Sequence, residues 1–425
     1  MDELNKYKTQ HLFLLVGENP LPNYVAAHLL LESGGKIHLA HSTGTQRQAK
    51  QLRKVLETDQ IHCLDLPLGD SESNASAIRE KIQQRLNTLN GTMGLHYTGG
   101  TKAMAVHACQ TLKAHAPNAV FSYLNPRRLE LCIDQASGES KPIKITPKML
   151  EITIQNLIAL HGWDLPSDPL ETDPLETPVQ PEASTAFAEF HADAELAKLW
   201  HDWCHNNLRK KPNGDFKGKT RLNEISIDLK SDANFPRHPK ILAALQELGM
   251  ESEQFSVQQL QVQGGFSDSK KLAEWIDSFW LEHYVLAQVN KIAKDQKIYN
   301  SVNSLTTKNP TNTDEKFEID VVFTRGYQLF GISCTTSHSK SLCKSKLFEA
   351  YVRAQQLGGA EARIALVCCT NPEHTDALKT EIVNVFTPIG SEPEDYKIEV
   401  FGREDLVNLS EKIAEWIQNV DRDAK

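Results

Sequence analysis

The feature that most constrains how this chain folds is the stretch YTGGTKAMA at residues 97–105. It joins an apolar run at 94–97 to a helical pattern at 103–112. The two glycines allow a tight turn, and Thr101 can cap the helix, whose first free N–H groups then point outward. With Lys102 beside them, these groups form a compact receptor for an anionic ligand. The stretch is not a Walker loop, because the spaced glycine is missing. Taken alone, it also suits a plain strand-to-helix turn.

Residues 1–150 alternate strand and helix signals. Short apolar strands at 11–16, 37–40, 61–66 and 94–97 are followed by helical patterns at 23–32, 46–57, 74–89 and 103–112. This alternation predicts a parallel sheet covered on both faces, and ligands bind such sheets beyond the carboxyl ends of the strands. Residues 17–23 are expected to be a rigid loop. The polar loops at three strand ends predict the ligand-binding residues Gly17, Glu18, Asn19, Pro20, Ser42, Thr43, Thr45, Thr98, Gly99, Gly100, Thr101 and Lys102.

The size and composition of the chain bound its class. A chain of 425 residues exceeds one ordinary core, so two or three domains are expected. The net charge of −9 argues against a protein that coats nucleic acid, and any polynucleotide contact must use a local basic groove. No apolar run approaches the roughly 18 residues of a membrane span, and the first residues do not resemble a signal peptide. The eight cysteines include no CxxC pair, which disfavours a zinc knuckle. We therefore expect a cytoplasmic protein without membrane contact.

The composition divides the chain into four segments. Residues 1–160 form the alternating α/β domain, and residues 161–195 form an acidic, Pro-rich linker that cannot bury a core. Residues 196–268 carry helical patterns and predict a small helical or winged-helix-like connector. Its basic loop at 209–221 is either solvated or in contact with nucleic acid. A second α/β domain spans residues 269–425.

The second α/β domain is expected to run helix, hairpin, helix, strand. The expected elements are a helix at 270–293, a turn-rich loop at 301–314, strands at 317–323 and 329–336 joined by a turn at 325–327, a helix at 344–357 and a strand at 363–369.

Carboxylates in this domain suggest metal-assisted cleavage of a phosphodiester. Asp320 lies mid-strand between apolar neighbours, where a carboxylate is costly unless it binds something. Glu318 projects from the same side of the strand, because side chains alternate, and Glu282 lies on the preceding helix. Such cleavage needs carboxylates to hold one or two divalent ions, and a lysine or its equivalent to orient the attacking water. The alternative for Asp320 is a carboxylate on an edge strand, paired with a base.

Both halves of the chain resemble the CARF nucleases, ancillary proteins of type III CRISPR systems. The loops GENPLPN at 17–23 and YTGGTKAMA at 97–105 are similar to the CARF sensor domain, over most of residues 10–150. The patterns WLE at 280–282, EID at 318–320, KLFEA at 346–350 and LGG at 357–359 are similar to the PD-(D/E)XK domain, over most of residues 270–415.

The resemblance implies a fold, an activity and partners. The implied fold is a Rossmann-like CARF domain plus a C-terminal restriction-endonuclease-like α/β domain. The sensor is implied to bind cyclic oligoadenylate, with cyclic tetra-adenylate as the allosteric activator, between the two subunits of a homodimer. The nuclease is implied to need Mg²⁺ or Mn²⁺ and to cleave RNA and/or DNA. A cyclic anion with four phosphates suits a symmetric pair of Gly-Gly-Thr-Lys loops.

The chain departs from the family pattern on the second active strand. The family carries Glu-x-Lys there, whereas Ser333 and Thr335 supply neither a carboxylate nor a cation. In one interpretation the missing groups lie on the next helix, where Lys346, Glu349, Arg353 and Gln356 share a face. The catalytic residues are then Asp320, Lys346, Glu349, Glu282, Ser333 and Thr335, the metal ligands are Asp320, Glu349 and Glu282, and Lys340 or Lys344 is a substitute for the lysine. In the other interpretation the nuclease is inactive, and Lys346 and Glu349 form an ordinary ion pair.

Three functions therefore compete. The first is an endonuclease of type III CRISPR antiviral defence that cyclic oligoadenylate activates. The second is a catalytically degenerate sensor whose C-terminal domain binds nucleic acid or a partner without cutting. The third is a sensor that mainly degrades its own cyclic ligand, with products that do not depend on Asp320.

Overall fold

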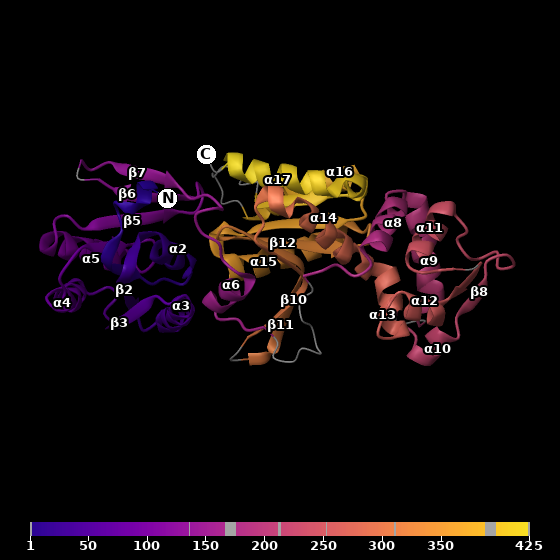
Figure 1. The fold of residues 1–425 in the computed structure, drawn as a ribbon, viewed down its shortest axis with the longest axis horizontal. Helices are drawn as coiled ribbons and strands as arrows, with labels where there is room; N and C mark the ends of the chain where they lie inside the picture. The colour runs from indigo at the N-terminus through magenta and orange to yellow at the C-terminus, as the bar shows by residue number, and fades with distance from the viewer. Residues whose placement is uncertain are drawn as a thin grey trace.

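The computed structural model describes residues 2–135, 137–165, 176–210, 214–251, 253–309, 312–386 and 397–423. Figure 1 shows three parts in a row: an N-terminal α/β domain, a central α/β domain made by the C-terminal part of the chain, and a helical part at the far end. The chain therefore passes from the N-terminal domain to the helical part before it returns to form the central domain. None of the described helices is long and apolar enough to cross a membrane.

The N-terminal domain is built on a seven-stranded sheet in the order β3-β2-β1-β4-β5-β6-β7. Its elements are α1 (Asp2–Asn5), β1 (Thr9–Leu15), α2 (Leu21–Leu30), β2 (Leu31–Ser42), α3 (Gln46–Thr58), β3 (His62–Gly69), α4 (Ala75–Leu86), β4 (Met93–His96), α5 (Lys102–His115), β5 (Val120–Asn125), β6 (Glu130–Asp134) and β7 (Ser140–Lys144). The first five strands in this order, from β3 at the edge to β5, are all parallel, which confirms the predicted parallel sheet. Strands β6 and β7 extend it in antiparallel fashion and were not predicted.

The loop after β1 is shorter than the sequence suggested. We expected a rigid loop at 17–23, but α2 begins at Leu21, with Pro22 in its first turn. Proline is well tolerated there, because the first N–H groups of a helix have no partner within it. The proline pair therefore starts the helix rather than delaying it.

The helical part follows α6 (Ile154–Leu160). It contains α8 (Pro181–His191), α9 (Ala194–Leu208), α10 (Lys219–Asn223), β8 (Ser226–Asp228), α11 (Pro239–Glu247), β9 (Gln254–Ser256), α12 (Val257–Gln263) and α13 (Ser269–Glu274). Helix α8 lies inside the segment expected to be a linker, whose residues 166–175 lie outside the described part of the chain. Aromatic side chains fill this part, and the Trp200 indole donates to the backbone oxygen of Ile276 at 2.9 Å. The helical part thus shares a core with the central domain.

The central domain has a five-stranded sheet in the order β10-β11-β12-β13-β14. Its elements are a π-helical turn (Trp275–Phe279), α14 (Trp280–Gln296), β10 (Asn300–Asn309), β11 (Asn312–Arg325), β12 (Gln328–Thr335), α15 (Lys340–Gly358), β13 (Arg363–Cys368), α16 (Pro372–Phe386), β14 (Ile398–Phe401) and α17 (Leu409–Asp423). Helices α14 and α17 pack on one face and α15 and α16 on the other. The predicted loop at 301–314 was wrong: most of it is β10, antiparallel to β11, while residues 310–311 lie outside the described part.

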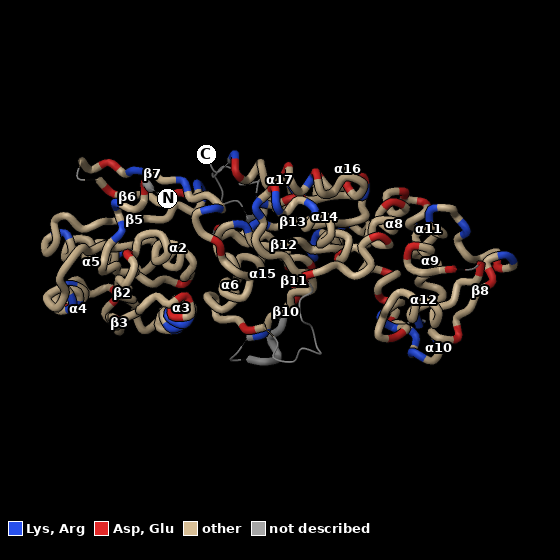
Figure 2. The backbone as a smooth tube through the Cα atoms, viewed as in Figure 1, with Lys and Arg blue, Asp and Glu red and all other residues tan. Residues whose placement is uncertain are grey.

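Basic and acidic residues alternate along much of the molecule. Figure 2 shows Lys and Arg interleaved with Asp and Glu along the described chain. In the predicted basic loop at 209–221, residues 211–213 lie outside the described part, and Arg209 pairs with the buried Asp277. A cation held in this way supports the fold rather than a free basic surface.

Candidate functional site

Asp320 is a buried carboxylate surrounded by donors. It lies in β11 with 8% of its surface exposed. Its Oδ2 atom accepts hydrogen bonds from the Ser333 hydroxyl at 3.0 Å and from the Cys334 backbone N–H at 2.6 Å, both in the neighbouring strand β12. The Lys346 ammonium lies 3.8 Å from the same oxygen. These donors offset the cost of burying the carboxylate and hold it in one orientation.

Two further carboxyl groups lie in the field of Asp320. Burial raises the pKa of Glu282 well above its usual range, and the Asp320 and Glu318 carboxylates raise it further. Desolvation, and then Asp320, also raise the pKa of Glu318. The Ser304 hydroxyl and the Lys346 ammonium oppose both shifts. Carboxyl groups that repel one another in this way form a site that attracts a cation.

The lysine of this group comes from α15. Burial alone lowers the pKa of Lys346, but the surrounding negative groups, Asp320 foremost, raise it above its usual value. Its distance to Asp320 is about 1 Å longer than a charge-assisted hydrogen bond. Lys340 and Lys344, the suggested substitutes, both pair with Glu381 of α16. Of these three lysines, only Lys346 approaches Asp320.

Ser304 completes the group, although the sequence does not single it out. Its Oγ donates to Oε2 of Glu282 at 3.2 Å. Its neighbours in β10 pair with the residues that flank Asp320 in β11, so Ser304 lies opposite Asp320. Its φ of +52° costs a residue with a Cβ roughly 1–2 kcal/mol. Backbone strain of this kind often concentrates at functional sites.

The remaining predicted catalytic residues lie further along the same elements. Glu349 is exposed on α15, about one turn after Lys346. The Thr335 hydroxyl, at the end of β12, accepts the Ser337 backbone N–H at 3.2 Å. The structure thus brings together Asp320, Glu282, Ser333 and Lys346.

The carboxylate oxygens of this group suit a hard divalent cation. Among the described residues, no three His, Cys, Asp or Glu side chains are arranged to enclose a metal ion. Mg²⁺ rarely needs such a cage, because it keeps several waters and binds through one or two carboxylates and substrate phosphates. Asp320 and Glu282 supply oxygen ligands of that kind, and their mutual repulsion favours a cation between them.

In the N-terminal domain, the loops after β1 and β4 touch backbone to backbone. A Cβ on Gly99 would lie 2.3 Å from the Leu15 carbonyl oxygen and 2.7 Å from the Gly17 nitrogen, so only glycine fits. Gly100 has a φ of +75°, which also favours glycine. The Thr101 hydroxyl accepts the Met104 backbone N–H at 3.1 Å, which confirms the predicted cap of α5. The start of α5 therefore offers N–H groups to an anion.

The other predicted ligand residues differ in what their side chains contact. Thr43 and Lys102 are exposed. The Ser42 and Thr45 hydroxyls lie 3.3 Å apart, and the Thr98 hydroxyl accepts the Leu124 backbone N–H at 2.7 Å.

The loop after β1 also faces another part of the molecule. Pro20 is buried. Glu18 lines a cavity of about 150 Å³ together with Arg47, His161 and Trp163. Asn19 Oδ1 lies 3.3 Å from His161 Nε2. These two side chains thus meet the end of α6 and the residues that follow it.

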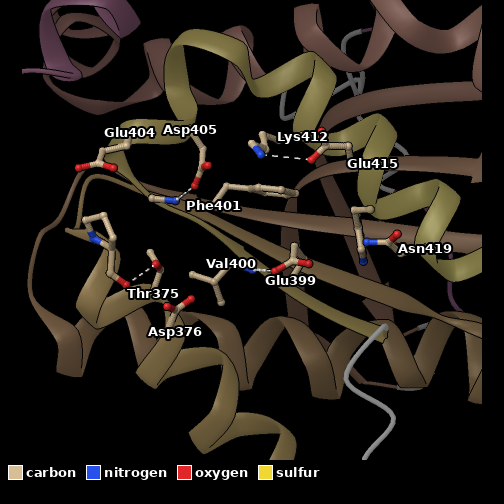
Figure 3. A pocket seen from close by; sticks show the side chains of 13 residues that line it. Thr375, Asp376, Glu399, Val400, Phe401, Glu404, Asp405, Lys412, Glu415 and Asn419 are labelled. Carbon is tan, nitrogen blue, oxygen red and sulfur yellow. Dashed lines mark hydrogen bonds and ion pairs between the residues drawn. The ribbon is translucent and has the colours of Figure 1, made fainter. Parts of the chain in front are cut away.

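A separate pocket of about 320 Å³ lies at the other edge of the central sheet, against β14 and between α16 and α17. Figure 3 shows its acidic lining, with Asp376, Glu399, Glu404, Asp405 and Glu415 around Phe401. Its Lys412 pairs with Glu415 at 3.2 Å. A lining of this charge repels phosphate, so the pocket does not suit a nucleic-acid backbone.

Comparisons with known proteins bear on the fold. No family model and no curated protein matches the sequence. Protein VC1899 from Vibrio cholerae has a TM-score of 0.66 at 16% identity, over 97% of this chain and 99% of that one. Can2 from Sulfobacillus thermosulfidooxidans, solved in complex with cyclic tetra-adenylate, has a TM-score of 0.65 at 15% identity, over 98% and 99%. The chain shares the fold of these proteins. A type III CRISPR defence DNA nuclease activated by cyclic oligoadenylate has a TM-score of 0.50 at 13% identity, over 84% of this chain and 45% of that one.

Proposed function

We propose that this protein is a metal-dependent endonuclease of type III CRISPR antiviral defence, which cyclic oligoadenylate activates and which cleaves RNA and/or DNA. The observation that carries the proposal is the approach of Lys346 to Asp320, next to Glu282 and Glu318. It is supported by the likeness in fold, over nearly the whole chain, to a protein that binds cyclic tetra-adenylate.

The N-terminal domain is the proposed sensor, and cyclic tetra-adenylate is its proposed activator. The loops after β1 and β4 meet at Gly99, and the exposed Lys102 adds a positive charge at the start of α5. N–H groups and a lysine at a helix start suit phosphate. A ring of repeated nucleotides is matched by two copies of the loop, so we propose a homodimer with one ligand between its subunits.

In the central domain, Asp320 and Glu282 are the proposed ligands of Mg²⁺ or Mn²⁺, and the exposed Glu349 remains a predicted third ligand. A bound divalent ion supplies charge stabilisation to the phosphoryl group. Ser333 and the Cys334 N–H orient Asp320, and Ser304 orients Glu282. Lys346 is held as an ammonium, which suits it to orient a water or to contact a phosphate oxygen. Ser333 thus supports Asp320 where the family pattern has a carboxylate.

The test is cleavage of labelled RNA and single-stranded DNA with Mn²⁺, with and without cyclic tetra-adenylate. The proposal predicts cleavage that needs the ligand and is lost in Asp320→Ala. Asp376→Asn, which alters the acidic pocket on the other edge of the sheet, is the matched control and should cleave normally.

The departure at Ser333 and Thr335 favours one alternative, a degenerate sensor that binds nucleic acid or a partner without cutting. In the same experiment, nucleic-acid binding that responds to the ligand without any product would support it. Linear adenylate products that persist in Asp320→Ala would instead indicate that the protein degrades its own ligand.

A further inference from the structure

The loop after β1 contacts the central domain through Asn19. Its Oδ1 accepts the Leu21 backbone N–H at 3.0 Å, which ties the side chain to the start of α2. Its amide nitrogen, Nδ2, also lies against Gly359, the residue that directly follows α15. The same loop touches the loop of Gly99 and Gly100, where the cyclic ligand is proposed to bind. Asn19 therefore joins the proposed ligand loop directly to the central domain.

The end of α15 is shaped around this side chain. A Cβ on Gly359 would come within 2.1 Å of Asn19 Nδ2. Gly359 has φ +60° and ψ −151°, a backbone region that is essentially restricted to glycine. The backbone conformation thus requires glycine at the point where α15 meets the loop after β1, and a Cβ there would displace the Asn19 side chain.

Glu361 lies two residues beyond this contact. It is 1% exposed, and burial raises its pKa to about 7 against the opposing effect of nearby groups that include Arg363 and Asn19. A buried carboxyl group is costly to leave without polar neighbours, because no water replaces them. The Asn19 amide therefore provides a polar neighbour to a buried carboxyl group.

Helix α15 connects this contact to the candidate active site. It runs without a break from Lys340 to Gly358, and Lys346 lies about 18 Å along its axis from Gly358. Its inner face packs in the same apolar core as α6 and the N-terminal sheet. Because a packed helix moves as a rigid element, a displacement at one end also moves the other end. The 3.8 Å between Lys346 and Asp320 leaves about 1 Å to close before a hydrogen bond forms.

We propose that Asn19 couples the ligand loop to the active site, by setting the position of α15 and hence that of Lys346. The proposal rests on the function proposed above, which it deepens by naming the residue that transmits the signal. Asn19 is a positioning residue in this scheme, since it touches neither the substrate nor the reacting atoms.

The test compares wild-type protein with Asn19→Ala and Glu361→Ala, with Asn87→Ala as the control at an exposed asparagine of the same domain. Three quantities are measured: the affinity for cyclic tetra-adenylate, the ratio of cleavage rates with and without it, and ligand-induced hydrogen exchange in residues 340–358. We expect Asn19→Ala to bind the ligand detectably while its stimulation of cleavage falls by about 10-fold or more. Asn87→Ala should behave as wild type, and Glu361→Gln, which keeps the length and polarity of the side chain, should retain most of the stimulation.

The outcomes separate the two proposals. Full stimulation in both Asn19→Ala and Glu361→Ala overturns the coupling and leaves the nuclease function intact. If wild-type protein binds the ligand but cleaves nothing, the proposed function fails, and hydrogen exchange decides the coupling alone. A ligand-induced change in residues 340–358 that Asn19→Ala abolishes then supports the coupling, and a change that is absent from wild type or unaltered in the variant overturns it.

Discussion

At the residue scale, Asp320 combines a proposed functional role with an energetic cost. Its charge raises the pKa of both Glu282 and Glu318. We predict that Asp320→Asn abolishes cleavage and at the same time raises the thermal stability, because the repulsion among the carboxyl groups is relieved. Thermal unfolding and single-turnover cleavage check this pair of effects. A variant that loses both stability and cleavage would mean that Asp320 mainly supports the fold.

Lys346 and Lys344 offer a matched comparison on one helix. Lys346 approaches Asp320, whereas Lys344 is bonded to Glu381 at 2.8 Å. We predict that Lys346→Ala slows cleavage about 100-fold or more, as expected for loss of a positioned catalytic group, and that Lys344→Ala changes the rate little. Rates measured with saturating ligand and metal decide the matter. Equal losses in the two variants would show that general positive charge, rather than position, matters.

At the element scale, the proposed ligand loops depend on a backbone contact that requires glycine at position 99. We predict that Gly99→Ala weakens binding of cyclic tetra-adenylate about 10-fold or more, because its Cβ would collide with the Leu15 carbonyl oxygen and push the loop after β4 away. Gly218→Ala, outside the proposed ligand loops, is the control: its Cβ would meet nothing within 4 Å. Calorimetric titration of both variants measures the effect. Unchanged affinity in Gly99→Ala would place the ligand elsewhere.

The same scale shows how far the sequence alone leads. Periodicity and loop chemistry predicted the parallel strands, the Thr101 cap and the position of Asp320 within an apolar strand. Each of these features depends on neighbours in the chain. Strand β10 was missed, since Ser, Thr and Asn dominate it and pairing with β11 forms it. Ser304 was missed because it lies in this strand, where its positive φ interrupts the alternation of buried side chains. The antiparallel β6 and β7 likewise depend on distant pairing.

Tertiary contacts also decide which predicted residues share a site. The face of α15 that carries Lys346 and Glu349 was recognised from their spacing. Only packing of α15 on β12 brings Lys346 to Asp320, while Glu349 stays exposed. Asn19 lies in a loop predicted to bind ligand, yet its side chain contacts Gly359, more than 300 positions away in the chain.

At the scale of the whole molecule, Glu361 makes stability depend on pH. Burial raises its pKa from 4.5 to about 7, so the folded protein holds a proton that the unfolded chain releases. The stability linked to this proton is fully present below pH 4.5 and is lost as the pH rises through about 7, by about 3 kcal/mol in all. We predict that Glu361→Gln removes this loss, and denaturation across pH 4.5–8 compares the two proteins. Parallel pH profiles would contradict the assignment.

The central claim links the N-terminal and central domains: an anionic ring bound at the start of α5 switches on cleavage at Asp320. The most direct test is the cleavage rate of full-length protein in Mn²⁺, titrated with cyclic tetra-adenylate, beside Asp320→Ala. The account predicts a saturable rise of about 10-fold or more in the wild type and no cleavage in the variant. A wild-type rate that ignores the ligand, or equal cleavage by Asp320→Ala, would contradict it.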